Sequence, residues 1–186
     1  RVTSLAYDPV EKKAYYTADN DAWRDLMELD VATGKTRTLL EDARIGDIAF
    51  DSADQSIWGI THINGLDTLV RVRAAHDAWN QVLTFRYGTQ LSDLDISPDG
   101  TMLCATISEI NGESRLDVFL IKDLLAANLH PIASLRLGTS IPESGAFSPD
   151  GKYVYATSFY TGVSNVYRLN IATNKFDAMT KAVTGF

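Results

Sequence analysis

Residues 147–175 read FSPDGKYVYATSFYTGVSNVYRLNIATNK, and this stretch decides the fold. It contains the turn sequence Ser-Pro-Asp-Gly, an alternating run, a polar loop, a second alternating run and a second turn. Proline fixes φ at the second position of such a turn and glycine ends it. Aromatic and β-branched residues, which fill the first run, favour a pleated strand. The stretch therefore predicts two strands that form a hairpin, with a tight turn at either end.

The same pattern occurs four times in the chain. The four copies align on the residue that starts the first turn, namely Asp8, Asp51, Ser97 and Ser148, at spacings of 43, 46 and 51 residues. Each turn leads into strand-like runs, and a short further run follows the second turn, so that each copy supplies four strands. Four-stranded units at this period are typical of β-propeller blades. A β-sandwich is the alternative, because its strands recur at similar intervals, but the shared register of the four copies favours the propeller.

We therefore predict an all-β fold: a β-propeller section of four four-stranded antiparallel blades within a single domain, residues 1–186. The predicted blades span residues 2–42, 44–86, 90–138 and 141–184. Because propellers have about 4–8 blades, and no terminal strand closes a ring, we expect part of a larger propeller of about 6–8 blades. An open arc would instead expose edge strands, through which two copies could pair as a homodimer. A short helix is expected within residues 122–129.

The repeat also carries a resemblance to a known family. Residues 148–175 resemble the propeller repeat of the TolB-like periplasmic proteins and of the propeller domains of the prolyl oligopeptidase family. Ser148–Tyr153 and Asn170–Lys175 match it well, and Ser97–Thr101 matches its first half. The resemblance implies a propeller that works outside the cytoplasm, in the periplasm or otherwise exported. It also implies a binding scaffold or auxiliary domain within a larger exported bacterial protein, and it specifies fold more than function.

Composition narrows the classes of partner. The chain has 24 acidic and 17 basic residues, a net charge of −7, which argues against binding the phosphates of nucleic acid. No apolar run approaches the ~18–20 residues that cross a bilayer. The single cysteine, Cys104, lies in an apolar run, so no internal disulfide can form and a small buried side chain is expected there.

The sequence predicts no catalytic residue. Gly162–Val166 is the nearest match to the nucleophile motif Gly-x-Ser-x-Gly, but it lacks the last glycine and lies in a predicted loop between strands. The chain is therefore expected to be non-enzymatic in itself. The alternative is an accessory gating propeller of a prolyl-oligopeptidase-type serine peptidase whose catalytic domain lies outside this chain.

No metal or cofactor is predicted either. Asp19, Asp21 and Asp25 suggest a calcium loop, but Trp23 and Arg24 stand where that loop would need an oxygen ligand and a glycine. A solvated loop is the favoured interpretation. The three histidines are scattered without the spacing of a zinc site; they are His62, His76 and His130.

The polar loops between the strands are the predicted binding face, because a rigid scaffold commonly presents its binding residues on loops. The candidate residues are Trp23, His62, Tyr160 and Asn165. The expected partner is a protein or peptide, since aromatic side chains dominate interface hot spots. Trp58 is expected in the core. Trp23 and Trp79 lie in predicted polar loops, where core packing is favoured over anchoring a partner.

Overall fold

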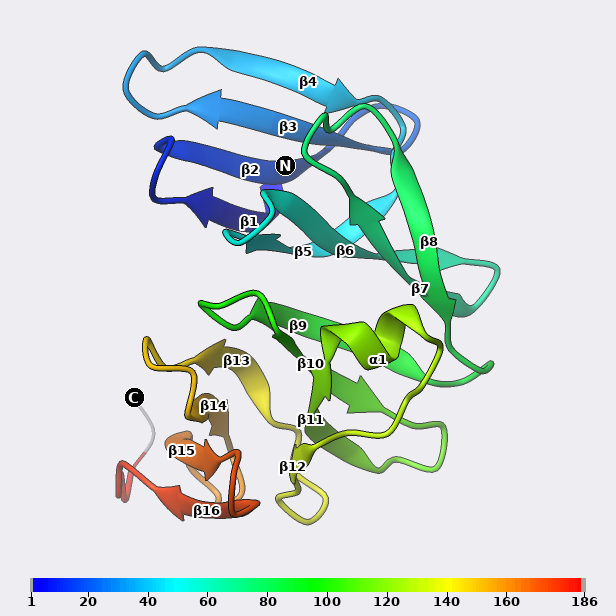
Figure 1. Ribbon diagram of the computed structural model, residues 1–186. Coiled ribbons are helices and arrows are strands. Elements are labelled where there is room, and N and C mark those ends of the chain that lie inside the picture. Colours follow the sequence, from blue (N-terminus) through cyan, green and yellow to red (C-terminus); the bar gives the residue numbers. More distant parts are fainter. Residues whose placement is uncertain (1, 185–186) are drawn as a thin grey trace. The chain divides into compact units, whose positions relative to one another are not determined.

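The computed structural model describes residues 2–184 and confirms the all-β prediction (Figure 1). The strands of the described residues form four antiparallel sheets of four strands each, and every sheet follows the chain order of its strands. The chain divides into two compact units, of which the first ends at Tyr87 and the second begins at Gly88. Two sheets belong to each unit.

The first unit contains strands β1 to β8. The strands of its first sheet are β1 (Val2–Asp8), β2 (Lys13–Asp19), β3 (Arg24–Asp30) and β4 (Thr36–Leu40). Those of its second sheet are β5 (Ile45–Asp51), β6 (Ser56–Ile63), β7 (Leu66–Val72) and β8 (Trp79–Thr84). Buried side chains of both sheets make one hydrophobic cluster: Ala6, Tyr15, Leu26, Ala43, Ile45, Ile48, Ile57, Val70 and Val72.

The second unit contains strands β9 to β16 and the helix. The strands of one sheet are β9 (Gln90–Ile96), β10 (Met102–Ser108), β11 (Ser114–Leu120) and β12 (Ala133–Leu135). Those of the other are β13 (Glu143–Phe147), β14 (Tyr153–Ser158), β15 (Asn165–Asn170) and β16 (Lys175–Ala178). Its cluster of buried side chains includes Cys104, Leu116, Val118, Leu135, Val154 and Leu169.

The helix α1 (Ile121–Leu125) is shorter than the eight residues expected from the sequence. It ends early because Ala127 takes a left-handed conformation, with φ at 58°. The Ala126 N–H still donates to the carbonyls of Lys122 and Asp123, which closes the last turn. In the part of the chain that the structure describes, no helix is long and apolar enough to cross a membrane.

The repeated turn is held by its first side chain. The Ser148 hydroxyl donates to Asp150 Oδ1 at 2.6 Å and accepts from the Tyr153 N–H at 3.0 Å. Ser97 makes the same pair of bonds, to Asp99 at 2.7 Å and from the Met102 N–H at 2.9 Å. The hydroxyl therefore joins the turn to the first residues of the following strand.

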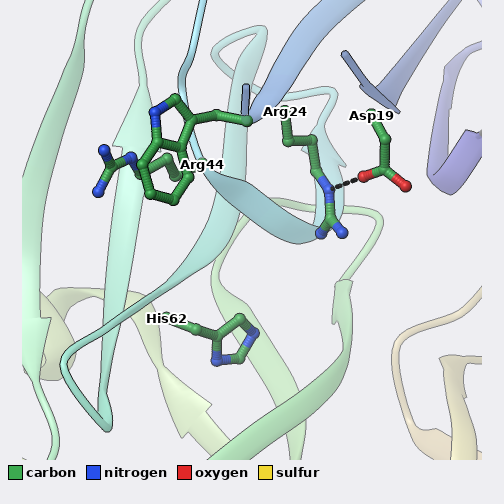
Figure 2. A pocket seen from close by; sticks show the side chains of 5 residues that line it. Asp19, Arg24, Arg44 and His62 are labelled. Atoms are coloured by element: carbon green, nitrogen blue, oxygen red, sulfur yellow. Dashed lines mark hydrogen bonds and ion pairs between the residues drawn. The ribbon is translucent and has the colours of Figure 1, made fainter. Parts of the chain in front are cut away.

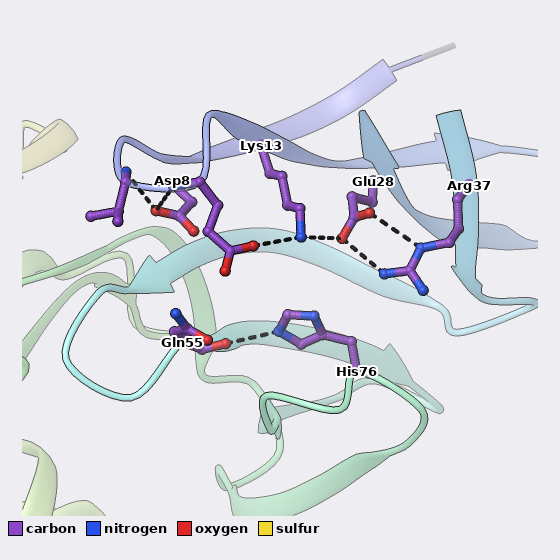
Figure 3. Close-up of polar contacts among 8 residues, drawn as sticks. Asp8, Lys13, Glu28, Arg37, Gln55 and His76 are labelled. Atoms are coloured by element: carbon purple, nitrogen blue, oxygen red, sulfur yellow. Dashed lines mark hydrogen bonds and ion pairs between the residues drawn. The ribbon is translucent and has the colours of Figure 1, made fainter. Parts of the chain in front are cut away.

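The first unit also contains a cross-strand polar cluster (Figure 3). Glu28 of β3 is buried and accepts from Arg37 of β4 at 3.2 Å (Nε) and 3.0 Å (Nη2). Lys13 of β2 lies 3.9 Å from the same carboxylate.

His76 is buried in the same unit, and its Nε2 donates to the Gln55 carbonyl at 2.8 Å. The buried His76 ring is therefore held by a backbone hydrogen bond, which indicates a structural role in the core of the unit.

The three tryptophans have different surroundings. Trp58 in β6 is fully buried, as expected. Trp23 and Trp79 are 50% and 37% exposed, so the core alternative is wrong for both. Trp79 also begins strand β8, where the sequence suggested a loop. Only tryptophans outside the core remain available to touch a partner.

Candidate functional site

A pocket of about 290 Å³ opens in the first unit (Figure 2). Its lining residues are Asp19, Trp23, Arg24, Arg44 and His62. Asp19 ends β2 and Arg24 begins β3, with Trp23 in the loop between them, while Arg44 precedes β5 and His62 lies near the end of β6. The pocket therefore joins two of the predicted site residues, Trp23 and His62, which are far apart in the sequence.

Asn20 organises the loop that carries Trp23. Its Oδ1 accepts from the N–H groups of Ala22 and Trp23, which caps the tight turn. Its amide nitrogen donates to Asp25 at 2.8 Å and to Asp42 at 3.0 Å. One side chain thus ties the β2–β3 loop to the segment that leads into β5.

Arg44 reaches the pocket through an unusual backbone. Its φ is 55° and that of Asp42 is 51°, both in the left-handed region, while Ala43 between them is buried. The Arg44 N–H donates to the Arg24 carbonyl at 3.1 Å, so the backbones of the two arginines lie side by side. The Arg44 guanidinium lies 3.3 Å from the centroid of the Trp23 ring, a close cation–π contact.

Among residues 2–184, Arg24 forms its side-chain hydrogen bond through Nε only. Its Nε donates to Asp19 Oδ1 at 2.9 Å, and the two terminal nitrogens of the guanidinium point away from that bond toward the side where His62 lies (Figure 2). The Arg24 side chain is 31% exposed and the Asp19 side chain is 40% exposed. The ion pair therefore fixes the guanidinium while leaving its outer edge accessible.

His62 is oriented by a buried carboxylate. His62 and Asp67 face each other across the β6–β7 hairpin, and His62 Nδ1 lies 2.7 Å from Asp67 Oδ1. The Asp67 side chain is 7% exposed, whereas that of His62 is 52% exposed. An ionised carboxylate only accepts, so Nδ1 carries the hydrogen and Nε2 of a neutral ring is the acceptor.

The other two predicted site residues lie in the second unit, in and beside the β14–β15 loop. Tyr160 is 50% exposed, and its ring meets that of Tyr167 edge to face with centroids 6.1 Å apart. Asn165 is only 4% exposed. Its amide donates to Thr161 Oγ1 at 3.0 Å, and its Oδ1 accepts from Thr180 Oγ1 at 2.9 Å. Asn165 therefore holds the loop, and a ligand role for it remains a prediction.

The three aspartates of the β2–β3 loop do not converge. Asp19 pairs with Arg24, Asp25 accepts from Asn20 and from the Asp42 N–H, and Asp21 is exposed. Among residues 2–184, no three histidine, cysteine, aspartate or glutamate side chains are grouped as metal ligands. Arg24, Arg44 and Asn20, by contrast, belong to the site although the sequence analysis did not propose them.

Comparison with known proteins identifies the fold. No family model and no curated protein sequence matches the chain. Among solved structures, TolB from Acinetobacter baumannii is 18% identical with a TM-score of 0.75, over 97% of this chain and 43% of that one. A putative TolB from Agrobacterium tumefaciens is 14% identical with a TM-score of 0.77, over 100% of this chain and 64% of that one.

An oligogalacturonate lyase in complex with manganese is 12% identical with a TM-score of 0.70, over 97% of this chain and 53% of that one. This chain thus spans about half the length of the chains it matches. Enzymes and TolB proteins share the architecture, and identities this low show the fold alone. The chain has the TolB-like β-propeller fold.

Proposed function

We propose that the chain is a non-catalytic propeller module that binds a protein or peptide through the pocket of its first unit, within a larger exported bacterial protein. The observation that carries the proposal is the meeting of Trp23, Arg24, Arg44 and His62 around one cavity. A half-exposed indole beside two guanidinium groups is the combination of side chains most enriched at interface hot spots. The likeness to TolB structures and to the TolB-like periplasmic repeat supports the exported setting.

The chemistry of the one thiol supports the non-catalytic part of the proposal. Burial raises the pKa of Cys104 well above its usual value, so the reactive thiolate is disfavoured. The Gly162–Val166 segment runs from the β14–β15 loop into the start of β15, and the strand-to-helix turn that a nucleophile motif requires is not formed there.

A peptide-library selection against the immobilised chain tests the proposal. Trp23→Ala removes the aromatic wall of the pocket, and Trp79→Ala is the matched control, because it removes an exposed indole from an outer strand of the same unit. We expect enriched peptides that bind the wild type and the Trp79 variant but lose about tenfold or more in affinity for the Trp23 variant. If no peptide is enriched, or if the enriched peptides bind all three chains equally, the proposal fails.

Pairing of two copies through edge strands also stays a prediction. Every residue of the edge strand β16 is exposed, as an open edge would be. Sedimentation equilibrium over a range of protein concentrations would detect a dimer, and a constant monomer mass would contradict it.

A further inference from the structure

We infer that the pocket is a carboxylate-binding site in which Arg44 and Arg24 hold a singly charged carboxylate beside Trp23. This site would define the chemistry of the ligand in the proposed function. It rests on that function only where the carboxylate belongs to a peptide. A side-chain carboxylate, a C-terminal carboxylate and a free carboxylate share this chemistry.

The Arg44 guanidinium is held by its contact with Trp23. The guanidinium lies against the Trp23 ring at 3.3 Å, which occupies one face of the guanidinium plane. Within residues 2–184 the side chain makes no hydrogen bond or ion pair, so the N–H groups at the edge of the plane have no protein acceptor. A guanidinium whose plane is fixed by an aromatic ring is preorganised to donate two parallel bonds to a carboxylate.

Arg24 supplies the second cationic group. Asp19 accepts from Nε, and in the described part of the chain the terminal nitrogens are left as donors on the pocket side (Figure 2). The hydrogen bond between the Arg44 N–H and the Arg24 carbonyl keeps the two residues adjacent. Two guanidinium groups and one lining carboxylate give the wall an excess of one positive charge.

The geometry of Arg44, rather than the surrounding charge, favours a carboxylate. Asp25 and Asp42 both accept from Asn20 of the β2–β3 loop, and the whole chain carries a net charge of −7. The attraction of the two guanidinium groups and the repulsion from these carboxylates both grow in proportion to the charge of the ligand, so charge alone does not separate phosphate from a carboxylate. A carboxylate is proposed because its two coplanar oxygens match the planar edge of the Arg44 guanidinium that lies against Trp23.

His62 adds a reason for a peptide as the source. With Nδ1 donating to Asp67, Nε2 is the ring atom that can accept a hydrogen bond when the ring is neutral, and it belongs to an exposed side chain of the pocket. An acceptor opposite two guanidinium donors fits a ligand that has an N–H close to its carboxylate. Peptides have this arrangement, whereas a simple free carboxylate lacks the N–H.

The test uses the indole N–H signals of the three tryptophans in a two-dimensional NMR titration of the ¹⁵N-labelled chain. Trp23 lines the pocket, while the buried Trp58 and the exposed Trp79 are internal controls. The ligands are propionate, its neutral isostere propionamide, inorganic phosphate, and three tripeptides blocked at the N-terminus. One tripeptide has a central glutamate and one has glutamine in its place, and both are also blocked at the C-terminus. The third has only a free C-terminal carboxylate, and all titrations share one ionic strength.

We expect propionate and at least one carboxylate peptide to shift the Trp23 signal, and propionamide and the glutamine peptide to leave it unchanged. A stronger response to phosphate than to propionate would overturn the assignment of a carboxylate. Arg44→Gln should weaken binding by about tenfold or more, because the charge-assisted bonds are lost. Arg44→Lys, which keeps the charge but loses the planar fork, should fall between. Arg73→Gln is the matched control, since Arg73 is an exposed arginine of the same unit outside the pocket, and it should bind as the wild type does.

The outcomes separate this inference from the proposed function. A Trp23 shift with propionate but with no peptide would support the carboxylate site and overturn peptide binding. Equal shifts with the glutamate and glutamine peptides would support peptide binding and overturn the carboxylate site. The carboxylate site would also be overturned by equal shifts with propionate and propionamide, or by no shift with any carboxylate. Unchanged affinity in the folded Arg44→Gln variant would overturn it as well.

Discussion

Ser148 shows how much one side chain contributes to the repeat. The residue is 5% exposed, and its hydroxyl makes two hydrogen bonds inside its own turn. Ser148→Ala would leave the Tyr153 N–H without that acceptor, so we expect the free energy of unfolding to fall by about 1–3 kcal/mol. Urea denaturation measures this change. Ser164→Ala, in an exposed loop of the same sheet, is the control and should stay within about 0.5 kcal/mol of the wild type.

The aspartates of the same turns make stability depend on pH. The hydrogen bond from the Ser148 hydroxyl, followed by that from the Lys152 N–H, lowers the pKa of Asp150 below its usual 3.8, and Ser97 and Thr101 do the same for the pKa of Asp99. A lowered folded-state pKa stabilises the fold above the unfolded-state pKa, and this contribution is lost as pH falls through the folded-state value. Asp99→Asn should therefore show a smaller loss of stability than the wild type when urea denaturation is repeated below about pH 4. Equal losses in the two chains would contradict the assignment.

At the scale of elements, β5 and β6 pack closely at Gly59. A Cβ on Gly59 would lie 2.3 Å from Ile45 Cγ2, and Ile45 is 1% exposed, so it has little room to move. We expect Gly59→Ala to destabilise the chain by about 1–3 kcal/mol, measured by thermal unfolding. Gly46→Ala is the contrast, because its Cβ would meet the half-exposed His62 ring at 3.2 Å and displace it at lower cost. If the two variants were equally stable, the packing argument would be wrong.

The strands and turns could be predicted because their signals are local. Period-2 patterns and Ser-Pro-Asp-Gly turns determine strand positions within a few residues. The inner strands, however, carry bulges that the pattern does not announce: Asp93 and Ser144 take φ of 54° and 56° at irregular points in the pairing of β9 and β13. Only the pairing with β10 and β14 shows where the extra residue falls.

The pocket could be predicted only in part, for a related reason. Trp23 and His62 stand out as an aromatic and a histidine in polar loops. Arg44 enters the pocket through its left-handed backbone, and Asn20 organises the site through a hydrogen bond to Asp42, which is 22 residues away. Contacts over such a separation follow from the packing of one sheet on the next, and no single stretch of sequence records them.

At the scale of the whole molecule, each compact unit has its own hydrophobic cluster. Leu116→Ala empties a fully buried position in the second unit and should cost about 2–5 kcal/mol. Hydrogen exchange followed by mass spectrometry should then show a larger loss of protection in residues 88–184 than in residues 2–87. Leu26→Ala, at a fully buried position in the first unit, should give the opposite distribution. The same uniform loss in both variants would show that the units open together.

The thiol of Cys104 allows the opening rate of the surrounding structure to be measured. The only thiol of the sequence lies in the cluster of the second unit, with no exposed surface and a raised pKa. An alkylating reagent in solution can reach it only during the moments when that part of the protein opens, and the first unit has no sulfhydryl to add a background. At high reagent concentration, the rate of modification of the unaltered protein therefore equals the opening rate of one half of the chain.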